Sequence, residues 1–134
     1  APNARLNGVL VQPMIPDGVE MMVGARVDPL FGPLIVVSLG GIFVEMMKDS
    51  AIALAPVTYD EAHAMLTSLK GVALLRGYRG RPPVDLDRLA DVVQRVSELA
   101  ADQSTRITEL DVNPLICNED RIVAVDGLIS RRSL

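Results

Sequence analysis

The chain has 134 residues, a formal net charge of −4 and one cysteine, with 49% hydrophobic residues but only 3% aromatic ones. This length suits one domain with a core of aliphatic side chains. The negative charge argues against non-specific nucleic-acid binding, and no apolar run approaches the ~20 residues of a membrane span. A single cysteine excludes an intramolecular disulfide and fits a reducing cytoplasm, which is the location we expect.

The first part of the chain contains runs that are typical of β-strands. Residues 1–7 are short and polar, so we expect a disordered or vector-derived leader. Residues 8–14 (GVLVQPM) predict a strand that stops at prolines, and residues 19–27 alternate between two faces. Residues 34–39 are almost entirely apolar, which predicts a strand buried on both faces. Together these runs predict an antiparallel meander.

A glycine pair, Gly40 and Gly41, follows the last of these runs directly. Two residues without side chains let backbone N–H groups approach a phosphate closely. An ordinary bulge or turn is the alternative, since the chain has neither a GxxxxGK[ST] nor a GxGxxG motif. Residues 42–47 are expected to continue or bend the strand.

Two helices are predicted in the middle of the chain. The stretch TYDE at 58–61 is a capping box, and a buried stripe follows it to Leu69, with Gly71 as a candidate C-cap. Asp85 caps a longer helix whose apolar residues keep helical spacing to about Ala101. The basic loop between the two helices suits a phosphate or an acidic partner surface, and a solvated loop is the alternative.

Residues 107–115 (ITELDVNPL) carry the strongest chemical pattern. As a strand, they place Glu109, Asp111 and Asn113 on one face within about 14 Å. Stacked acids repel unless a cation lies among them, and oxygen ligands suit Mg²⁺ with nucleotide phosphate completing its shell. A second alternating run can pair with this strand across a turn and bring Asp126 towards Asn113. The alternative is a solvent-facing polar strand with a turn.

The order of predicted elements defines the fold class. Three strands, a helix, a loop, a longer helix and a hairpin do not form an alternating βαβ chain. We therefore predict an α+β domain with a mostly antiparallel sheet and packed helices.

Four segments taken together resemble a known family. They are residues 8–33, LGGIFVEMMKD at 39–49, LLRGYRGRPPVDLDRL at 74–89 and ITELDVNPL at 107–115. They resemble the ATP-grasp domain of NDP-forming acyl-CoA synthetases, which is similar to the nucleotide-binding subunit of succinyl-CoA synthetase. The resemblance covers nearly the whole chain, and Ser38 stands where the family commonly has glycine.

The resemblance implies that residues 8–134 are the C-terminal lobe of an ATP-grasp domain. The N-terminal lobe, the CoA-binding domain and the histidine that these enzymes phosphorylate would then lie outside this chain, in the same enzyme or a partner subunit. The implied reaction couples NTP cleavage to acyl-CoA formation through an acyl phosphate and a phosphohistidine. The resemblance supplies no catalytic residue within this chain, and it is compatible with an oligomer.

The resemblance also implies a nucleotide site and a Mg²⁺ site. The positions that would contact ATP or GTP are Gln12, Pro13, Met14, Glu20, Gly40 and Gly41. The positions that would form the metal site are Asp111, Asn113 and Asp126. Within the first set, Gln12 would meet the adenine amine and Glu20 would accept hydrogen bonds from the ribose hydroxyls.

Two other functions stay open. The same fold can serve as the regulatory, synthetase-like part of a protein acyltransferase, or as a non-catalytic interaction module. A phosphorylatable histidine elsewhere in the gene product would favour the synthetase, whereas its loss beside an acetyltransferase domain would favour the regulator. Unchanged turnover after Asn113→Ala and Asp126→Ala would favour the interaction module.

Overall fold

The computed structural model of the chain describes residues 5, 7–41 and 49–132. Within these ranges the strands are β1 (Val19–Asp28), β2 (Gly32–Leu39), β3 (Ser50–Leu54), β4 (Ile107–Cys117), β5 (Ile122–Ala124) and β6 (Gly127–Arg131). The helices are α2 (Tyr59–Ser68), α3 (Val72–Leu75) and α4 (Leu86–Asp102). None of the helices in this part of the chain is long and apolar enough to cross a membrane.

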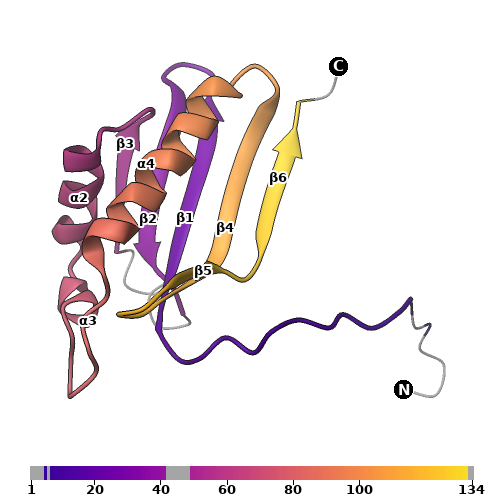
Figure 1. Cartoon of the computed structure of the whole chain (residues 1–134). Helices are drawn as coiled ribbons and strands as arrows, with labels where there is room; N and C mark the ends of the chain where they lie inside the picture. Colours follow the sequence, from indigo (N-terminus) through magenta and orange to yellow (C-terminus); the bar gives the residue numbers. More distant parts are fainter. Residues whose placement is uncertain (1–4, 6, 42–48, 133–134) are drawn as a thin grey trace.

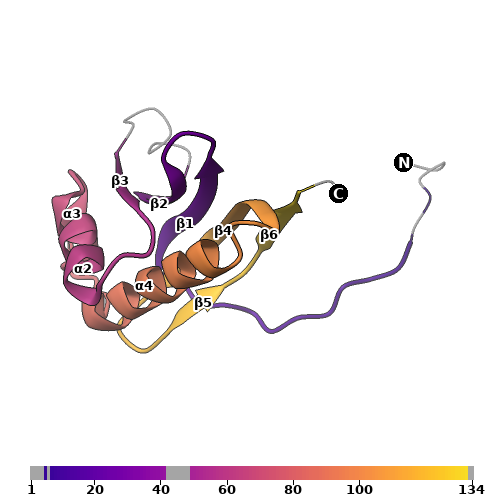
Figure 2. The same ribbon diagram turned by 90° about the horizontal axis from the view of Figure 1, so that it is seen from above.

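All strand pairs are antiparallel. The sheet has the order β3-β2-β1-β4-β5, and β6 also pairs with β4. The helices lie on one face of the sheet, where α4 crosses β1 and β2 (Figures 1 and 2). Among the described residues, the opposite face carries no helix in either view. This arrangement confirms the predicted α+β class with packed helices.

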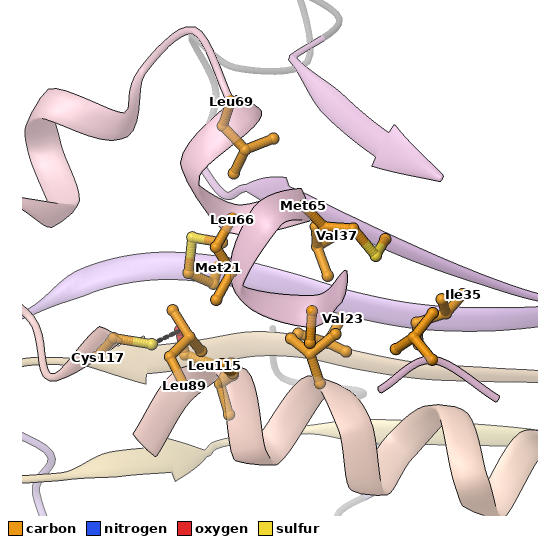
Figure 3. Close-up of a cluster of buried hydrophobic side chains, with 14 of the residues drawn as sticks. Met21, Val23, Ile35, Val37, Met65, Leu66, Leu69, Leu89, Leu115 and Cys117 are labelled. Atoms are coloured by element: carbon orange, nitrogen blue, oxygen red, sulfur yellow. Dashed lines mark hydrogen bonds between the residues drawn. The ribbon is translucent and has the colours of Figure 1, made fainter. Parts of the chain in front are cut away.

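The core lies between the sheet and the helices and is aliphatic, as the composition predicts. Figure 3 shows Met21 from the sheet beside Leu66 of α2, and Leu115 from the sheet beside Leu89 of α4, all four buried. Alternate residues of β1 and β2 supply this layer, because successive strand side chains point to opposite faces. The intervening residues of β1 and β2 therefore belong to the face without helices.

The helix starts are set by the predicted caps. The Thr58 side chain accepts a hydrogen bond from the Glu61 backbone N–H at 3.3 Å, and Glu61 accepts from the Thr58 N–H at 2.7 Å. Asp85 accepts from the Arg88 N–H at 3.0 Å at the start of α4. The prediction for Gly71 was wrong, because α2 ends at Ser68 with Leu69 as its C-cap, and Gly71 is the N-cap of α3 instead.

The strand predicted at residues 8–14 was also wrong. In the structure residues 7–18 form an extended arm outside the sheet (Figure 1), and Val9 and Val11 are 89% and 90% exposed. An alternating apolar run becomes a strand only where a partner offers hydrogen bonds. Here β1 has β2 on one side and β4 on the other, so no edge of β1 is free for a meander neighbour.

Other differences concern burial and short elements. β2 is fully buried on only one face, since Ile35 and Val37 are inaccessible whereas Leu34 and Val36 retain partial exposure. The sequence patterns missed β3, α3 and β6, which have only four or five residues each. The expectation for residues 42–47 lies outside the described residues.

Candidate functional site

The burial pattern of β4 changes phase at an irregularity beside its polar residues. The β1 step from Met21 to Val23 covers two residues, while the paired step along β4 covers three, so β4 carries one extra residue there. Leu110 before this point and Leu115 after it are both buried, so the burial alternation changes phase between them. The polar residues in between lie on the face away from the helices.

The three predicted metal ligands lie together. Asp111, Asn113 and Asp126 line a hollow of about 310 Å³ with Gly127 and Leu128. The Asn113 backbone N–H donates to the Asp126 carbonyl oxygen at 3.2 Å, and one Asp126 carboxylate oxygen accepts from the Gly127 N–H at 2.8 Å. The predicted β4–β5 hairpin is present and begins the chain reversal that brings Asp126 back to Asn113.

Asp111 is the electrostatically unusual residue of this hollow. Its Oδ1 atom is buried and has no hydrogen-bond partner among the described residues. The pKa of Asp111 is raised, first by burial and then by the nearby carboxylates of Glu109 and Asp126, while the Asn113 amide partly opposes the rise. A buried carboxylate oxygen without a donor is costly, so this site favours a proton or a cation.

The donor set of the hollow fits Mg²⁺. Its side chains offer two carboxylates and one amide oxygen, which are the hard ligands that this ion prefers. Across the described ranges, no group of three or more His, Cys, Asp or Glu side chains is placed to hold a metal, so the amide of Asn113 would be a necessary member of the set. Gly24 faces Asp111 across the β1–β4 pair, and the absence of a side chain there leaves the carboxylate uncrowded.

A second cavity contains the predicted ribose ligand and the glycine pair. Glu20, Gly40 and Gly41 line a cleft of about 450 Å³. The Gly40 N–H donates to the Glu20 carbonyl at 2.6 Å, and a Cβ on Gly40 would lie 3.0 Å from the Cβ of Glu20. Gly40 therefore lets β1 and β2 approach closely beside Glu20, and its N–H is used within the fold rather than held open for a phosphate. Gly41 has a φ of 94°, which favours glycine.

Three residues from the basic loop line the same cleft: Tyr78, Arg79 and Arg81. The sequence allowed this loop to meet a phosphate or an acidic partner surface, with a solvated loop as the alternative, and none of the three was predicted as a site residue. Their signal in the sequence was two arginines that flank one glycine, and only the fold brings them to the same cleft as Glu20.

The positions predicted to contact adenine lie apart from both cavities. Gln12, Pro13 and Met14 belong to the extended arm, where Met14 is 93% exposed. They line neither the hollow at Asp111 nor the cleft at Glu20. The described residues thus group the predicted ligands into three separate places.

Sequence comparison identifies relatives for this arrangement. The ATP-grasp domain family matches residues 1–130. ADP-forming acetate–CoA ligase I of Archaeoglobus fulgidus is 44% identical over 125 residues, which cover 93% of this chain and 18% of that protein. The β subunit of ADP-forming acetate–CoA ligase I of Pyrococcus furiosus is 43% identical over 126 residues, which cover 94% of this chain and 54% of the subunit. The chain thus spans only part of each relative.

Structural comparison leads to the same group. Acetyl-coenzyme A synthetase 1 of Ca. Korarchaeum cryptofilum, in complex with coenzyme A and Ca-AMPCP, superposes with a TM-score of 0.88 at 38% identity, over 98% of this chain and 57% of that one. Another structure of that protein contains coenzyme A and Mg-AMPPCP and matches with a TM-score of 0.83. From the match over residues 1–130 and these relatives, the chain belongs to the ATP-grasp domain family, in the group found in ADP-forming acyl-CoA synthetases.

Proposed function

We propose that this chain is the nucleotide- and Mg²⁺-binding C-terminal lobe, residues 8–134, of an NDP-forming acyl-CoA synthetase. The observation that carries the proposal is the buried, unpartnered Oδ1 of Asp111 beside Asn113 and Asp126. Burial and like charge both penalise this carboxylate, and a divalent cation would offset both penalties. The relative that contains Mg-AMPPCP supports the choice of Mg²⁺ and an adenine nucleotide.

Different residues of the chain would bind different parts of the Mg-nucleotide complex. Asp111, Asn113 and Asp126 would hold Mg²⁺, which when bound neutralises phosphate charge during phosphoryl transfer. Glu20, seated against Gly40, would accept hydrogen bonds from the ribose hydroxyls. Gln12, Pro13 and Met14 would reach the adenine edge once the arm has a partner, and Gly41 would keep the approach to Glu20 open.

The remaining parts of the reaction would come from other domains. An N-terminal ATP-grasp lobe and a CoA-binding domain, in the same polypeptide or a partner subunit, would complete the enzyme. The chain corresponds to 54% of a β subunit and to 18% of a longer ligase, which supports both arrangements. A cytoplasmic location is part of the same proposal.

The proposal is tested by turnover in the full-length protein. Asn113→Ala and Asp126→Ala should each lower the rate of ADP-forming acyl-CoA synthesis at least tenfold, because each removes an oxygen ligand of the metal. Asp120→Asn, in the exposed turn between β4 and β5, removes one charge from the same hairpin and serves as the matched control. Turnover that is unchanged in both alanine variants would refute the metal site.

Glu20 has a separate test. Calorimetry should show weaker nucleotide binding by Glu20→Ala, with an unchanged melting temperature in the absence of ligand, because the side chain is exposed in the cleft. Equal affinity of the variant and the parent would contradict the ribose assignment. Such a result would leave the metal test unaffected, since the two cavities share no lining residue.

The 134-residue chain by itself should fold but neither turn over nor bind MgATP tightly. Its phosphate ligands would face water on one side, and charge interactions at a given distance are several-fold weaker there than in a partly desolvated cleft. Titration of MgATP into the chain checks this expectation. Micromolar affinity, or acyl-CoA formation without added protein, would show that one lobe suffices.

A further inference from the structure

The cleft at Glu20 has a second wall that the proposed function does not use. This wall is the loop at residues 76–83 between α3 and α4, which contributes Tyr78, Arg79 and Arg81 to the lining. The loop and Glu20 come from segments more than fifty residues apart in the sequence. Tertiary folding alone therefore places two arginines and a glutamate on the lining of one cleft.

The backbone of this loop is held in a defined and unusual shape. Gly77, Arg79 and Gly80 all have positive φ values, of 91°, 51° and 81°. A Cβ on Gly77 would lie 2.8 Å from the Arg81 carbonyl oxygen, so the loop closes tightly on itself there. The Val84 N–H then donates to the Leu75 carbonyl at 2.8 Å and fastens the base of the loop. A non-glycine residue held at positive φ is a kind of strain that clusters at ligand sites.

The two arginines of the wall have no carboxylate partner within the described ranges. The ion pairs there are Arg88–Asp85 and Arg95–Asp91, both on or beside α4. The Arg79 guanidinium instead lies over the Tyr78 ring, 5.4 Å from its centroid, which restricts where the side chain points. In a chain with a formal charge of −4, two arginines are thus left available at one cleft.

We propose that this cleft binds a phosphoryl group, with Arg79 and Arg81 as its anion ligands. Guanidinium groups donate paired hydrogen bonds in a planar fork that matches phosphate oxygens. Glu20 in the same cleft repels a bare anion but accepts hydrogen bonds from hydroxyl or amine donors. The fitting ligand is therefore a phosphoryl group attached to a donor-bearing carrier, with the phosphoryl at the arginines and the donors at Glu20.

This anion site is distinct from the hollow at Asp111. Glu20 precedes Gly24 by four residues on β1, and Gly24 pairs with Asp111, so the two places are about 13 Å apart along the strand. The ligand chemistry can come from two sources, which are the phosphate of a nucleotide and a phosphorylated side chain on another domain. The inference stands without the metal proposal, because it uses none of the proposed metal ligands.

The test is an NMR titration of the chain with sodium orthophosphate without Mg²⁺, at an ionic strength held constant with sodium chloride. Saturable shifts of the Arg79 and Arg81 side-chain N–H signals are expected. Arg79→Gly should weaken phosphate binding at least fivefold, and it suits the positive φ at this position, so loss of the fold is not a concern. Arg95→Gln, on the exposed face of α4, is the matched control and should bind as the parent does.

A second titration adds ADP and then phosphate to the same sample. If ADP shifts the arginine signals and prevents phosphate from binding, the site takes the phosphate of a nucleotide. If ADP and phosphate bind together, the phosphoryl group has another source, which a synthetic phosphopeptide then checks. Both results support the anion site.

Two results would overturn the inference. One is arginine shifts in phosphate that equal those in chloride, and the other is phosphate affinity of Arg79→Gly equal to that of the parent. Neither result would bear on Mg²⁺ binding at Asp111, which is measured separately by adding the metal without phosphate.

Discussion

Removing the charge of Asp111 should stabilise the metal-free chain. The pKa of this carboxyl is raised by burial and by Glu109, so the folded state binds the proton more tightly than the unfolded chain does. The protonated Asp111 carboxyl contributes to the stability of the folded chain at low pH. This contribution is lost as the pH rises from the pKa of Asp111 in the unfolded chain through its higher pKa in the folded chain. At neutral pH the ionised Asp111 therefore destabilises the fold, and Asp111→Asn should relieve that cost.

The size of the effect follows from the strand geometry. Side chains two residues apart on one strand face are about 6.6 Å apart. Two like charges at this distance repel by roughly 0.6 kcal/mol in water and about 2.5 kcal/mol at an effective dielectric constant of 20. Asp111 is half-buried, so we expect a stabilisation of about 1 kcal/mol, or ~4 °C in melting temperature for a domain of this length.

Thermal unfolding without Mg²⁺ measures the cost of the ionised Asp111, and thermal unfolding with Mg²⁺ measures the stabilisation by the bound ion. Magnesium should raise the melting temperature of the parent at pH 7, because a ligand that binds only the folded state stabilises it. It should have little effect on Asp111→Asn, and the effect on the parent should fade as the pH is lowered and Asp111 becomes protonated. Asp120→Asn, which makes the same change in net charge on an exposed turn, should change the melting temperature little.

The reasoning would be refuted by either of two outcomes. A metal-free Asp111→Asn variant that melts below the parent would mean that the carboxylate is stabilised by a partner. An equal response of parent and variant to Mg²⁺ would mean that the ion binds elsewhere.

Three further predictions concern the fold that supports the two cavities. Ser97→Ala should lower the free energy of unfolding by about 1–3 kcal/mol, because the buried Ser97 hydroxyl accepts the Val57 N–H at 3.0 Å and its loss leaves that donor unpaired; urea denaturation measures this. Gly71→Ala should cost about 1–2 kcal/mol in the same assay, since the new Cβ would lie 2.2 Å from the buried Leu39 side chain, and an unchanged midpoint would contradict the packing. Burial raises the pKa of Cys117 to about 12, so a thiol reagent at pH 8 should label it only on unfolding, and rapid labelling of the native chain would count against a structural role.

The prediction of local elements from the sequence succeeded where the signal and the structure were both local. The capping box at Thr58 and Glu61 and the cap at Asp85 fix helix starts through contacts within three residues, so the pattern contains the whole interaction. The alternation along residues 107–113 likewise placed Asp111 and Asn113 on one face before any fold was known. The motif resemblance indicated the family, which the comparisons confirmed.

The arm at residues 8–14 shows why strand patterns fail. An apolar pattern indicates that a segment is able to form a β-strand. The strand forms only if a free edge of another strand, elsewhere in the molecule, offers it hydrogen bonds. The two edges of β1 pair with β2 and β4, and the residues of β4 that pair with β1 are more than eighty positions away in the sequence. The same limit hid β3 and β6, whose few residues carry too short a pattern to be recognised alone.

The sequence by itself determined the residue chemistry: oxygen ligands on one strand face, a carboxylate at Glu20, and arginines in a glycine-rich loop. Tertiary structure decided which of these groups meet. It joined Asp126 to Asn113 through the hairpin, left the Oδ1 atom of Asp111 buried without a hydrogen-bond partner, and brought Arg79 and Arg81 to the same cleft as Glu20. The physical reason is that charge and hydrogen-bonding capacity belong to a residue, whereas burial and proximity depend on the packing of segments far apart in the chain.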